Sequence, residues 1–240
     1  MPRIAALSDA QLPEGSRPMV DAVKAKLGMA PNIIRTLAHA PAALNAYLSM
    51  SQALAGGALS AGEREEVALA VAQANGCGYC LSAHSLMAKG AGVAAETQLA
   101  ARQGESSALT SFARKVTLTR AQVNDQDVAD ARGAGLSDAQ IVEVLAQVAF
   151  NTLTNYLNHV AATDIDFPVV VVQVDYPGAS PEVVEAEVTK KVEESVNTIA
   201  GINQLYSRSY ESVSVVIVQF NLDVDGRKAA DDVREKLAIV

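Results

Sequence analysis

The stretch EEVALAVAQANGCGYCLSAH, residues 65–84, holds both cysteines of this 240-residue chain, Cys77 and Cys80. Two thiols three positions apart can close a small disulfide, or one can attack an oxidant while the other resolves the product. His84 follows Cys80 by one helical turn, where an imidazole can help a thiol lose its proton. A thiol at the start of a helix also has its thiolate favoured by the helix dipole. The stretch therefore predicts two helices joined at the first cysteine, and redox chemistry at that junction.

A proton relay can be built from the same stretch. The Asn-Gly pair before Cys77 predicts the end of one helix, and Cys77 should begin the next. Cys80 and His84 then share one face of the second helix. Glu65 lies about three turns upstream of Cys77 on the first helix, so a helical hairpin would bring its carboxylate to His84. The candidate catalytic residues are Cys80, Cys77, His84 and Glu65, as thiol, second thiol, base and acid of one relay.

Two other interpretations of the cysteine pair stay open from the residues alone. The pair could be structural, without chemistry, or half of a zinc site, although zinc prefers four ligands and the chain has no second cysteine pair. Tyr79, between the cysteines, would either shape a pocket or simply pack. His39 and His159 are expected to be ordinary polar residues on helices, with the alternative that His159 lines the site because its helix is expected to pack into the core. No cofactor, metal or flavin is suggested.

Composition and charge narrow the class of protein. Half of the residues are hydrophobic, which allows a packed core, and the formal charge of −8 argues against binding nucleic acid or anionic membranes. No apolar run approaches the length needed to cross a bilayer. The polar N-terminus, residues 1–17, lacks the apolar core of a signal peptide. We therefore expect a soluble, cytoplasmic protein.

The composition changes sharply near Phe167. Residues 1–167 hold 37 Ala and 12 Val, whereas residues 168–240 hold 6 Ala and 17 Val. Alanine suits closely packed helices and valine suits strands. We expect an all-α domain over residues 1–166 and a small α+β domain over residues 167–240. The expected helices of the first domain are 18–28, 32–38, 41–55, 60–75, 78–90, 93–103, 107–122, 125–134 and 137–161.

Capping signals and periodicity refine these helices. Ser60 with Glu63, and Ser137 with Gln140, have the spacing of capping boxes. In the last helix one face carries mostly apolar residues, and we expect that face to pack into the core. It consists of Ile141, Leu145, Val148, Thr152, Tyr156 and Val160.

The second domain reads as strand, helix, strand, strand, helix. A strand from Pro168 to Val174 is followed by a helix that starts at Ser180-Pro181, a hairpin over 202–209 and 213–221, and a helix over 226–237. This is a ferredoxin-like βαββα order without its final strand. One sheet edge should stay unpaired, and we expect Ile239-Val240, the first domain or a neighbouring subunit to cap it.

The spacing from Glu65 through Cys77-x-x-Cys80 to His84 resembles the alkylhydroperoxidase D / carboxymuconolactone decarboxylase superfamily, and the helical layout of residues 1–167 resembles its peroxidase-related branch. The resemblance implies that Cys80 attacks the peroxide, Cys77 resolves it as a disulfide, and Glu65 and His84 relay protons. Well-studied alkylhydroperoxidases carry His where this chain has Tyr79. The lactone decarboxylases work without a redox CxxC, so the intact pair argues against decarboxylation.

Residues 167–240 resemble something different, the first porter subdomain of resistance-nodulation-division efflux pumps. The resemblance rests on the stretch from Phe167 through Tyr176-Pro177-Gly178-Ala179-Ser180, and on the helix and hairpin that follow. Such pumps need transmembrane helices to couple protons to export, and this sequence shows none. We therefore expect a fragment that does not transport.

Together these observations predict a CxxC-dependent thiol peroxidase that carries a porter fragment at its C-terminus. The resemblance implies a hydroperoxide substrate and regeneration by an external dithiol of the lipoyl or thioredoxin type. It also implies a homotrimer, because both families form trimers. We interpret the chain as an engineered chimera, with a natural fusion as the alternative. The rival function is a non-catalytic trimeric scaffold that displays the porter fragment.

Overall fold

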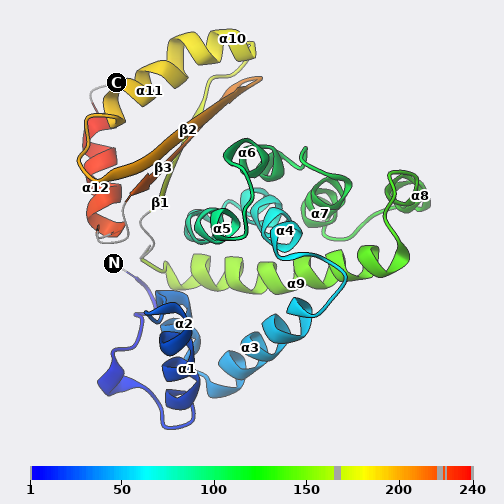
Figure 1. The fold of residues 1–240 in the computed structure, drawn as a ribbon, viewed down its shortest axis with the longest axis vertical. Coiled ribbons are helices and arrows are strands. Elements are labelled where there is room, and N and C mark those ends of the chain that lie inside the picture. The colour runs from blue at the N-terminus through cyan, green and yellow to red at the C-terminus, as the bar shows by residue number, and fades with distance from the viewer. Residues whose placement is uncertain (1, 165–168, 221–223, 225, 239–240) are drawn as a thin grey trace.

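The computed structural model describes residues 2–164, 169–220, 224 and 226–238, and these residues form a helical part followed by a small sheet with its own helices (Figure 1). The predicted fold class, an all-α domain followed by a small α+β domain, is confirmed. The expected boundary between the two domains, at residues 166 and 167, lies outside the described residues. The helical part consists of η1 (Asp9–Gln11), α1 (Arg17–Leu27), α2 (Asn32–Leu37), α3 (Pro41–Ala55), α4 (Ala61–Ala74), α5 (Gly78–Gly90), α6 (Ala95–Gln103), α7 (Ala108–Thr119), α8 (Asp125–Gly133) and α9 (Asp138–Ala161).

Helix starts follow the expected capping chemistry. Glu63 donates its backbone N–H to Ser60 Oγ at 3.3 Å, and Ser60 donates its own N–H back to Glu63 Oε2 at 2.8 Å. Ser137 and Gln140 close the same reciprocal box at the start of α9. Each box satisfies two backbone donors that the first turn of a helix leaves free.

Helix α4 is the centre of the helical part. It packs against α5, α6, α7 and α9, and all six residues from Val67 to Ala72 are buried. In Figure 1 the long α9 runs beneath α4 to α7, and α2 lies near the C-terminal end of α9. The turn that ends α4, at Asn75 and Gly76, lies close to the last turns of α9.

The expected orientation of α9 is wrong along its C-terminal half. Ile141 and Val148 are buried as expected, but Tyr156 and Val160 are exposed, and so is Leu145 nearer the middle. The face that packs inward carries polar side chains instead: Gln147, Asn151, Thr154, Asn155 and Asn158. Hydrophobic periodicity pointed to the wrong face because the inward amides bind the α4–α5 region, as described below.

The C-terminal part consists of β1 (Val169–Asp175), α10 (Pro181–Val184), a π-helical turn η2 (Glu185–Thr189), α11 (Lys190–Val196), β2 (Ile202–Tyr210), β3 (Val213–Phe220) and α12 (Gly226–Leu237). The strand order is β1-β3-β2, and both pairs are antiparallel. This is the ferredoxin-like order without the fourth strand, which would pair with the free edge of β1. Of the residues expected to cap that edge, Ile239 and Val240 lie outside the described residues.

The two faces of the sheet are covered by different parts of the chain. Val216 and Val218 of β3 pack with α11 and α12, whereas Val215 and Ile217 face the helical part. Leu99 of α6 lies in the cluster with Val215 and Ile217. Figure 1 shows the sheet between α10 to α12 on one side and α5 with α6 on the other. The helical part therefore covers one face of the sheet, and β3 is buried on both sides.

Hydrogen bonds reinforce this contact between the two parts. Lys89 Nζ donates to Asn203 Oδ1 at 3.1 Å and to Gln219 Oε1 at 3.2 Å. The Tyr210 hydroxyl donates to the Leu99 carbonyl at 2.7 Å. Contacts of this kind make the two parts one packed body.

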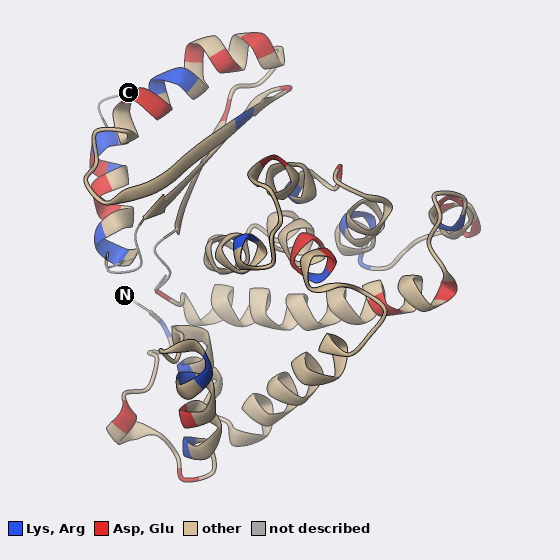
Figure 2. Cartoon of the chain, in the orientation of Figure 1, with Lys and Arg blue, Asp and Glu red and all other residues tan. Residues whose placement is uncertain are grey.

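Charged residues are unevenly distributed (Figure 2). Acidic and basic side chains gather on α10, α11 and α12, whereas α3 has none and α9 has only Asp138 and Glu143. Among the helices that the structure describes, none is both long enough and apolar enough to cross a bilayer.

The docking of the sheet can be tested at Leu99, which is 2% exposed. Replacing a buried leucine by alanine typically costs about 2–5 kcal/mol, so Leu99→Ala should lower the free energy of unfolding by an amount in that range. Leu118→Ala is the matched control, because Leu118 is 57% exposed. Urea denaturation followed by circular dichroism measures both. Equal stability of the two variants would contradict the docked arrangement.

Candidate thiol site

The turn between α4 and α5 is built around Gly76. Its φ of +66° lies in the left-handed region, which glycine adopts without strain. Gly76 donates its N–H to the Gln73 carbonyl at 3.1 Å, and Cys77 donates to the Ala72 carbonyl at 2.9 Å. This pair of bonds is a Schellman motif, which ends α4 and sends the chain directly into α5.

Cys77 is the N-cap residue of α5, and its Sγ accepts a hydrogen bond from the Cys80 N–H at 3.3 Å. The two cysteines form a disulfide across 5.3 Å between Cα atoms. Both residues are buried. The sulfur of Cys77 thus lies at the positive end of the α5 dipole, where a thiolate is favoured once the disulfide is reduced.

Glu65 and His84 meet between α4 and α5. Glu65 Oε2 lies 2.7 Å from His84 Nδ1, and both side chains are largely buried. A carboxylate only accepts hydrogen bonds, so Nδ1 carries the proton in this contact. In neutral His84 the other ring nitrogen, Nε2, is then the basic one. His84 lies one turn beyond Cys80 on α5, so the structure brings the four sequence-predicted residues into one region of the helical hairpin.

Helix α9 contributes contacts that the sequence analysis missed. Asn158 donates from Nδ2 to Cys80 Sγ at 3.3 Å and approaches Cys77 Sγ at 4.0 Å. Asn155 Oδ1 accepts from the Asn75 side chain at 2.9 Å. His159 Nε2 lies 2.9 Å from the Asn75 carbonyl, and so must donate its proton there. Three side chains spaced i, i+3 and i+4 on α9 therefore hold the turn that carries the disulfide.

The remaining histidine and the tyrosine between the cysteines lie outside this proton relay. The Tyr79 hydroxyl accepts a hydrogen bond from the Ile33 N–H at 3.2 Å, near the start of α2, and the side chain is buried. Tyr79 therefore ties α5 to α2. His39 Nε2 lies 2.9 Å from the Ala5 carbonyl near the N-terminus, away from the disulfide.

Tyr47 of α3 is a further titratable group close to Glu65. Burial, with a smaller contribution from the Glu65 charge, raises the pKa of the Tyr47 phenol to about 12. Its ring stacks on Phe150 of α9 with centroids 4.9 Å apart. Tyr47 is therefore a neutral group near Glu65 at physiological pH.

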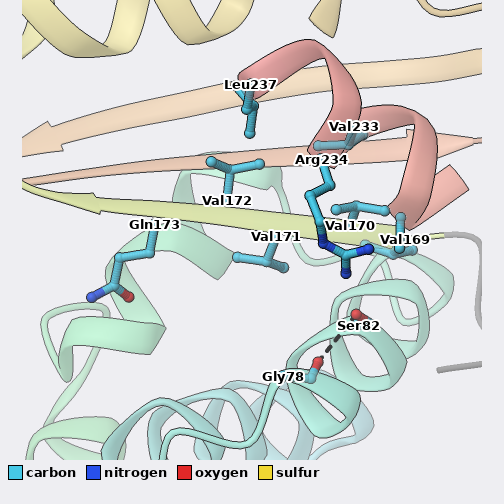
Figure 3. A pocket seen from close by; sticks show the side chains of 11 residues that line it. Gly78, Ser82, Val169, Val170, Val171, Val172, Gln173, Val233, Arg234 and Leu237 are labelled. Carbon is cyan, nitrogen blue, oxygen red and sulfur yellow. Dashed lines mark hydrogen bonds between the residues drawn. The ribbon is translucent and has the colours of Figure 1, made fainter. Parts of the chain in front are cut away.

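A cavity of about 350 Å³ lies on the face of α5 that carries Gly78 and Ser82, between α5 and the C-terminal part (Figure 3). Gly78 and Ser82 form its α5 side, β1 supplies a row of valines, and Arg234 of α12 points toward α5. Ser82 Oγ donates to the Gly78 carbonyl at 3.1 Å. The cavity follows the free edge of β1 and does not include either cysteine.

In the part of the chain that the structure describes, no arrangement of side chains is suited to binding a metal ion. No group of three or more His, Cys, Asp or Glu side chains there is placed to hold a metal ion. The two sulfurs that a zinc half-site would use are joined to each other. The arrangement can instead exchange two electrons between a disulfide and two thiols, and the Glu65–His84 pair lies on the same two helices.

Comparisons with known proteins match two different families to two stretches of the chain. Residues 41–117 match the carboxymuconolactone decarboxylase family, and residues 156–240 match the AcrB/AcrD/AcrF family. The second match begins within α9. Neither match covers half of the chain.

Two solved structures resemble the helical part. A peroxidase-related protein with an alkylhydroperoxidase AhpD core from Ralstonia eutropha JMP134 is 27% identical, covers 69% of this chain and 92% of its own, and has a TM-score of 0.62. A peroxidase-related protein from Silicibacter sp. TM1040 is 26% identical, covers 68% and 92% of the two chains, and has a TM-score of 0.59.

The C-terminal part is similar to a much longer protein. Multidrug resistance protein MdtC from Salmonella arizonae is 41% identical over 70 residues, which are 29% of this chain and 7% of the relative. The chain thus spans a small fraction of the curated relatives it matches. The helical part of the chain resembles the alkylhydroperoxidase D / carboxymuconolactone decarboxylase superfamily in its peroxidase-related branch, and the C-terminal part resembles the porter region of resistance-nodulation-division efflux pumps.

Proposed function

We propose that the helical part is a CxxC-dependent thiol peroxidase that reduces alkyl hydroperoxides. The observation that carries this proposal is the Cys77–Cys80 disulfide with the Glu65–His84 pair one helical turn away. The likeness to peroxidase-related proteins supports an enzyme of this kind. The chemistry needs no metal and no flavin, because the electrons come from the two thiols.

In the first step the Cys80 thiolate attacks the terminal oxygen of the hydroperoxide and the O–O bond breaks. Cys80 becomes a sulfenic acid, and the alkoxide leaves as the alcohol after it receives a proton through His84 and Glu65. In the second step Cys77 attacks the Cys80 sulfur, water leaves, and the disulfide forms. An external dithiol of the lipoyl or thioredoxin type then returns two electrons and two protons.

The roles of the two thiols follow from their surroundings. Cys80 has His84 one turn further along α5, which suits the thiol whose reaction releases an alkoxide in need of a proton. Cys77 caps α5 and accepts a backbone N–H, and a hydrogen bond at the positive end of a helix favours the thiolate that attacks a sulfenic acid. We therefore assign Cys80 as the peroxide-attacking thiol and Cys77 as the resolving thiol.

The assignment predicts different products in the two serine variants. Cys80→Ser should abolish peroxide consumption. Cys77→Ser should leave a sulfenic acid on Cys80 that dimedone traps. Mass spectrometry after one equivalent of peroxide distinguishes them. Sulfenate on Cys77 in the Cys80→Ser variant would reverse the roles.

The relay predicts a loss of rate without a loss of fold. General acid–base catalysis contributes about 10²–10⁴-fold, so Glu65→Gln and His84→Gln should each slow thiol oxidation by a factor in that range. Stopped-flow kinetics with cumene hydroperoxide gives the rates, and circular dichroism checks the helices. Wild-type rates in both variants would remove the relay from the mechanism.

We further propose that the chain is an engineered fusion joined within residues 166–169 and that it assembles as a homotrimer. The two family matches do not overlap and come from unrelated protein classes. The exposed apolar residues Leu145, Leu153, Tyr156 and Val160 form a stripe along α9, and the neighbouring α3 has no charged residue. Depletion of charge with exposed aliphatic and aromatic side chains is typical of the core of a protein interface.

The assembly predicts a mass well above the 25.0 kDa of one chain. Light scattering should give about three times that mass by the trimer proposal, and Leu153→Glu should shift the protein toward monomer because it buries a charge in the interface. Leu118→Glu, at an exposed leucine of α7, is the control. A monomer that persists at all concentrations would contradict the assembly.

The second candidate function is a non-catalytic scaffold that presents the porter fragment. The extensive contact between β3 and the helical part favours it, because such docking fixes the fragment rigidly. A turnover assay with hydroperoxide and a dithiol decides between the two. Absence of turnover together with a stable disulfide would favour the scaffold.

A further inference from the structure

Asn158 is a buried residue whose side chain, among the described residues, donates hydrogen bonds only to sulfur. Its side chain is 6% exposed. Nδ2 donates to Cys80 Sγ at 3.3 Å and lies 4.0 Å from Cys77 Sγ. Its Oδ1 has no hydrogen-bond partner among the described residues. The neighbouring Asn155, in contrast, binds Asn75 and so has a structural partner.

A purely structural role does not account for this amide. Burying a carboxamide with an unpaired oxygen costs about 1–3 kcal/mol. A disulfide sulfur is a weak hydrogen-bond acceptor, so the bond seen in the oxidised state offsets little of that cost. An apolar residue of similar size would pack at this position without the cost.

Reduction of the disulfide changes the strength of the hydrogen bond from Asn158 to Cys80. A disulfide sulfur carries no proton, so the amide must present its NH₂ group to Cys80. When two electrons enter and Cys80 becomes a thiolate, the acceptor gains a full charge. Hydrogen bonds to charged acceptors are roughly twice as strong as neutral ones. The donor from Asn158 therefore stabilises the reduced, ionised form more than the oxidised form.

We propose that Asn158 is a further catalytic residue, which donates a hydrogen bond to the Cys80 thiolate and so lowers the pKa of that thiol. This inference rests on the proposed function, because it takes Cys80 as the attacking thiol. It adds a group from α9 to a site that the sequence placed entirely on α4 and α5.

The protonation of the Cys80 thiol also depends on other titratable groups of the site. His84 and Cys77 face it from α5, Glu65 from α4 acts through His84, and the neutral Tyr47 lies on α3. On α9 itself, His159 donates to the Asn75 carbonyl. A test of Asn158 must therefore leave all of these unchanged.

The experiment measures the alkylation rate of Cys80 by iodoacetamide against pH, with the full chain reduced and Cys77→Ser as the parent. Asn158→Ala should raise the apparent pKa of Cys80 by about one unit, which slows alkylation about tenfold at pH values below it. Asn158→Asp has the same size but brings a carboxylate, and should raise the pKa further. Asn151→Ala is the matched control, because Asn151 is a buried amide on the same face of α9 that donates to the Gln147 carbonyl.

An unchanged Cys80 pKa in both Asn158 variants would overturn the proposal. An equal rise in Asn151→Ala would also overturn it, because it would indicate a general disturbance of α9. Asn158→Asp gives the answer if the alanine variant fails to fold. Alkylation does not depend on peroxide turnover. An inactive wild-type protein with the expected pKa shift would therefore refute the peroxidase and leave this role of Asn158 intact.

Discussion

The left-handed conformation of Gly76 is the constraint on which the thiol site depends. A Cβ at this position would meet no atom within 4 Å, so the requirement comes from the backbone and not from crowding. With φ at +66° the Schellman bonds end α4 after Asn75 and place Cys77 at the cap of α5. The angle between the two helices follows from this turn, and with it the meeting of Glu65 and His84. A residue with a side chain would be strained there.

Helix α9 holds the same turn from outside. Its last turns supply an amide to the Asn75 side chain, an imidazole to the Asn75 carbonyl and an amide to the Cys80 sulfur. Polar side chains here replace the apolar packing usual for a central helix. The arrangement fixes the disulfide between two elements that are far apart in sequence, and the apolar side chains of the last turns of α9, Tyr156 and Val160, are left exposed.

Local signals in the sequence were enough to predict most elements. The capping boxes at Ser60 and Ser137 and the breaker at Gly76 placed the helix ends, and the spacing of Glu65, Cys80 and His84 placed their side chains on facing helices. Asn158 could not be found in this way, because its partner lies about 80 positions earlier and an asparagine in a helix has no periodic signature. The same limit explains the wrong face predicted for α9. Periodicity finds an apolar stripe but cannot say whether the core or another subunit covers it.

The contact between the two parts leaves some buried polar groups without hydrogen-bond partners among the described residues. Arg102 is 1% exposed, and burial lowers the pKa of its guanidinium to about 10, so it stays charged at neutral pH. Its Nε and Nη2 both donate to Gln73 Oε1, at 2.9 and 2.7 Å, while Nη1 has no partner among the described residues. Arg114 lies beside a groove that β1 and β3 also line. Its buried Nη1 likewise has no hydrogen-bond partner among the described residues.

Evolved interiors rarely leave charged donors unpaired, and a buried charge without a counter-ion is costly. Both arginines belong to the helical part. Without the sheet, solvent or another partner would accept hydrogen bonds from their Nη1 groups. The valine-rich face of the sheet covers the arginines because an apolar sheet face packs against another layer of the protein. The contact is thus driven by the apolar face of the sheet against Leu99 and its neighbours, with incomplete polar pairing around it.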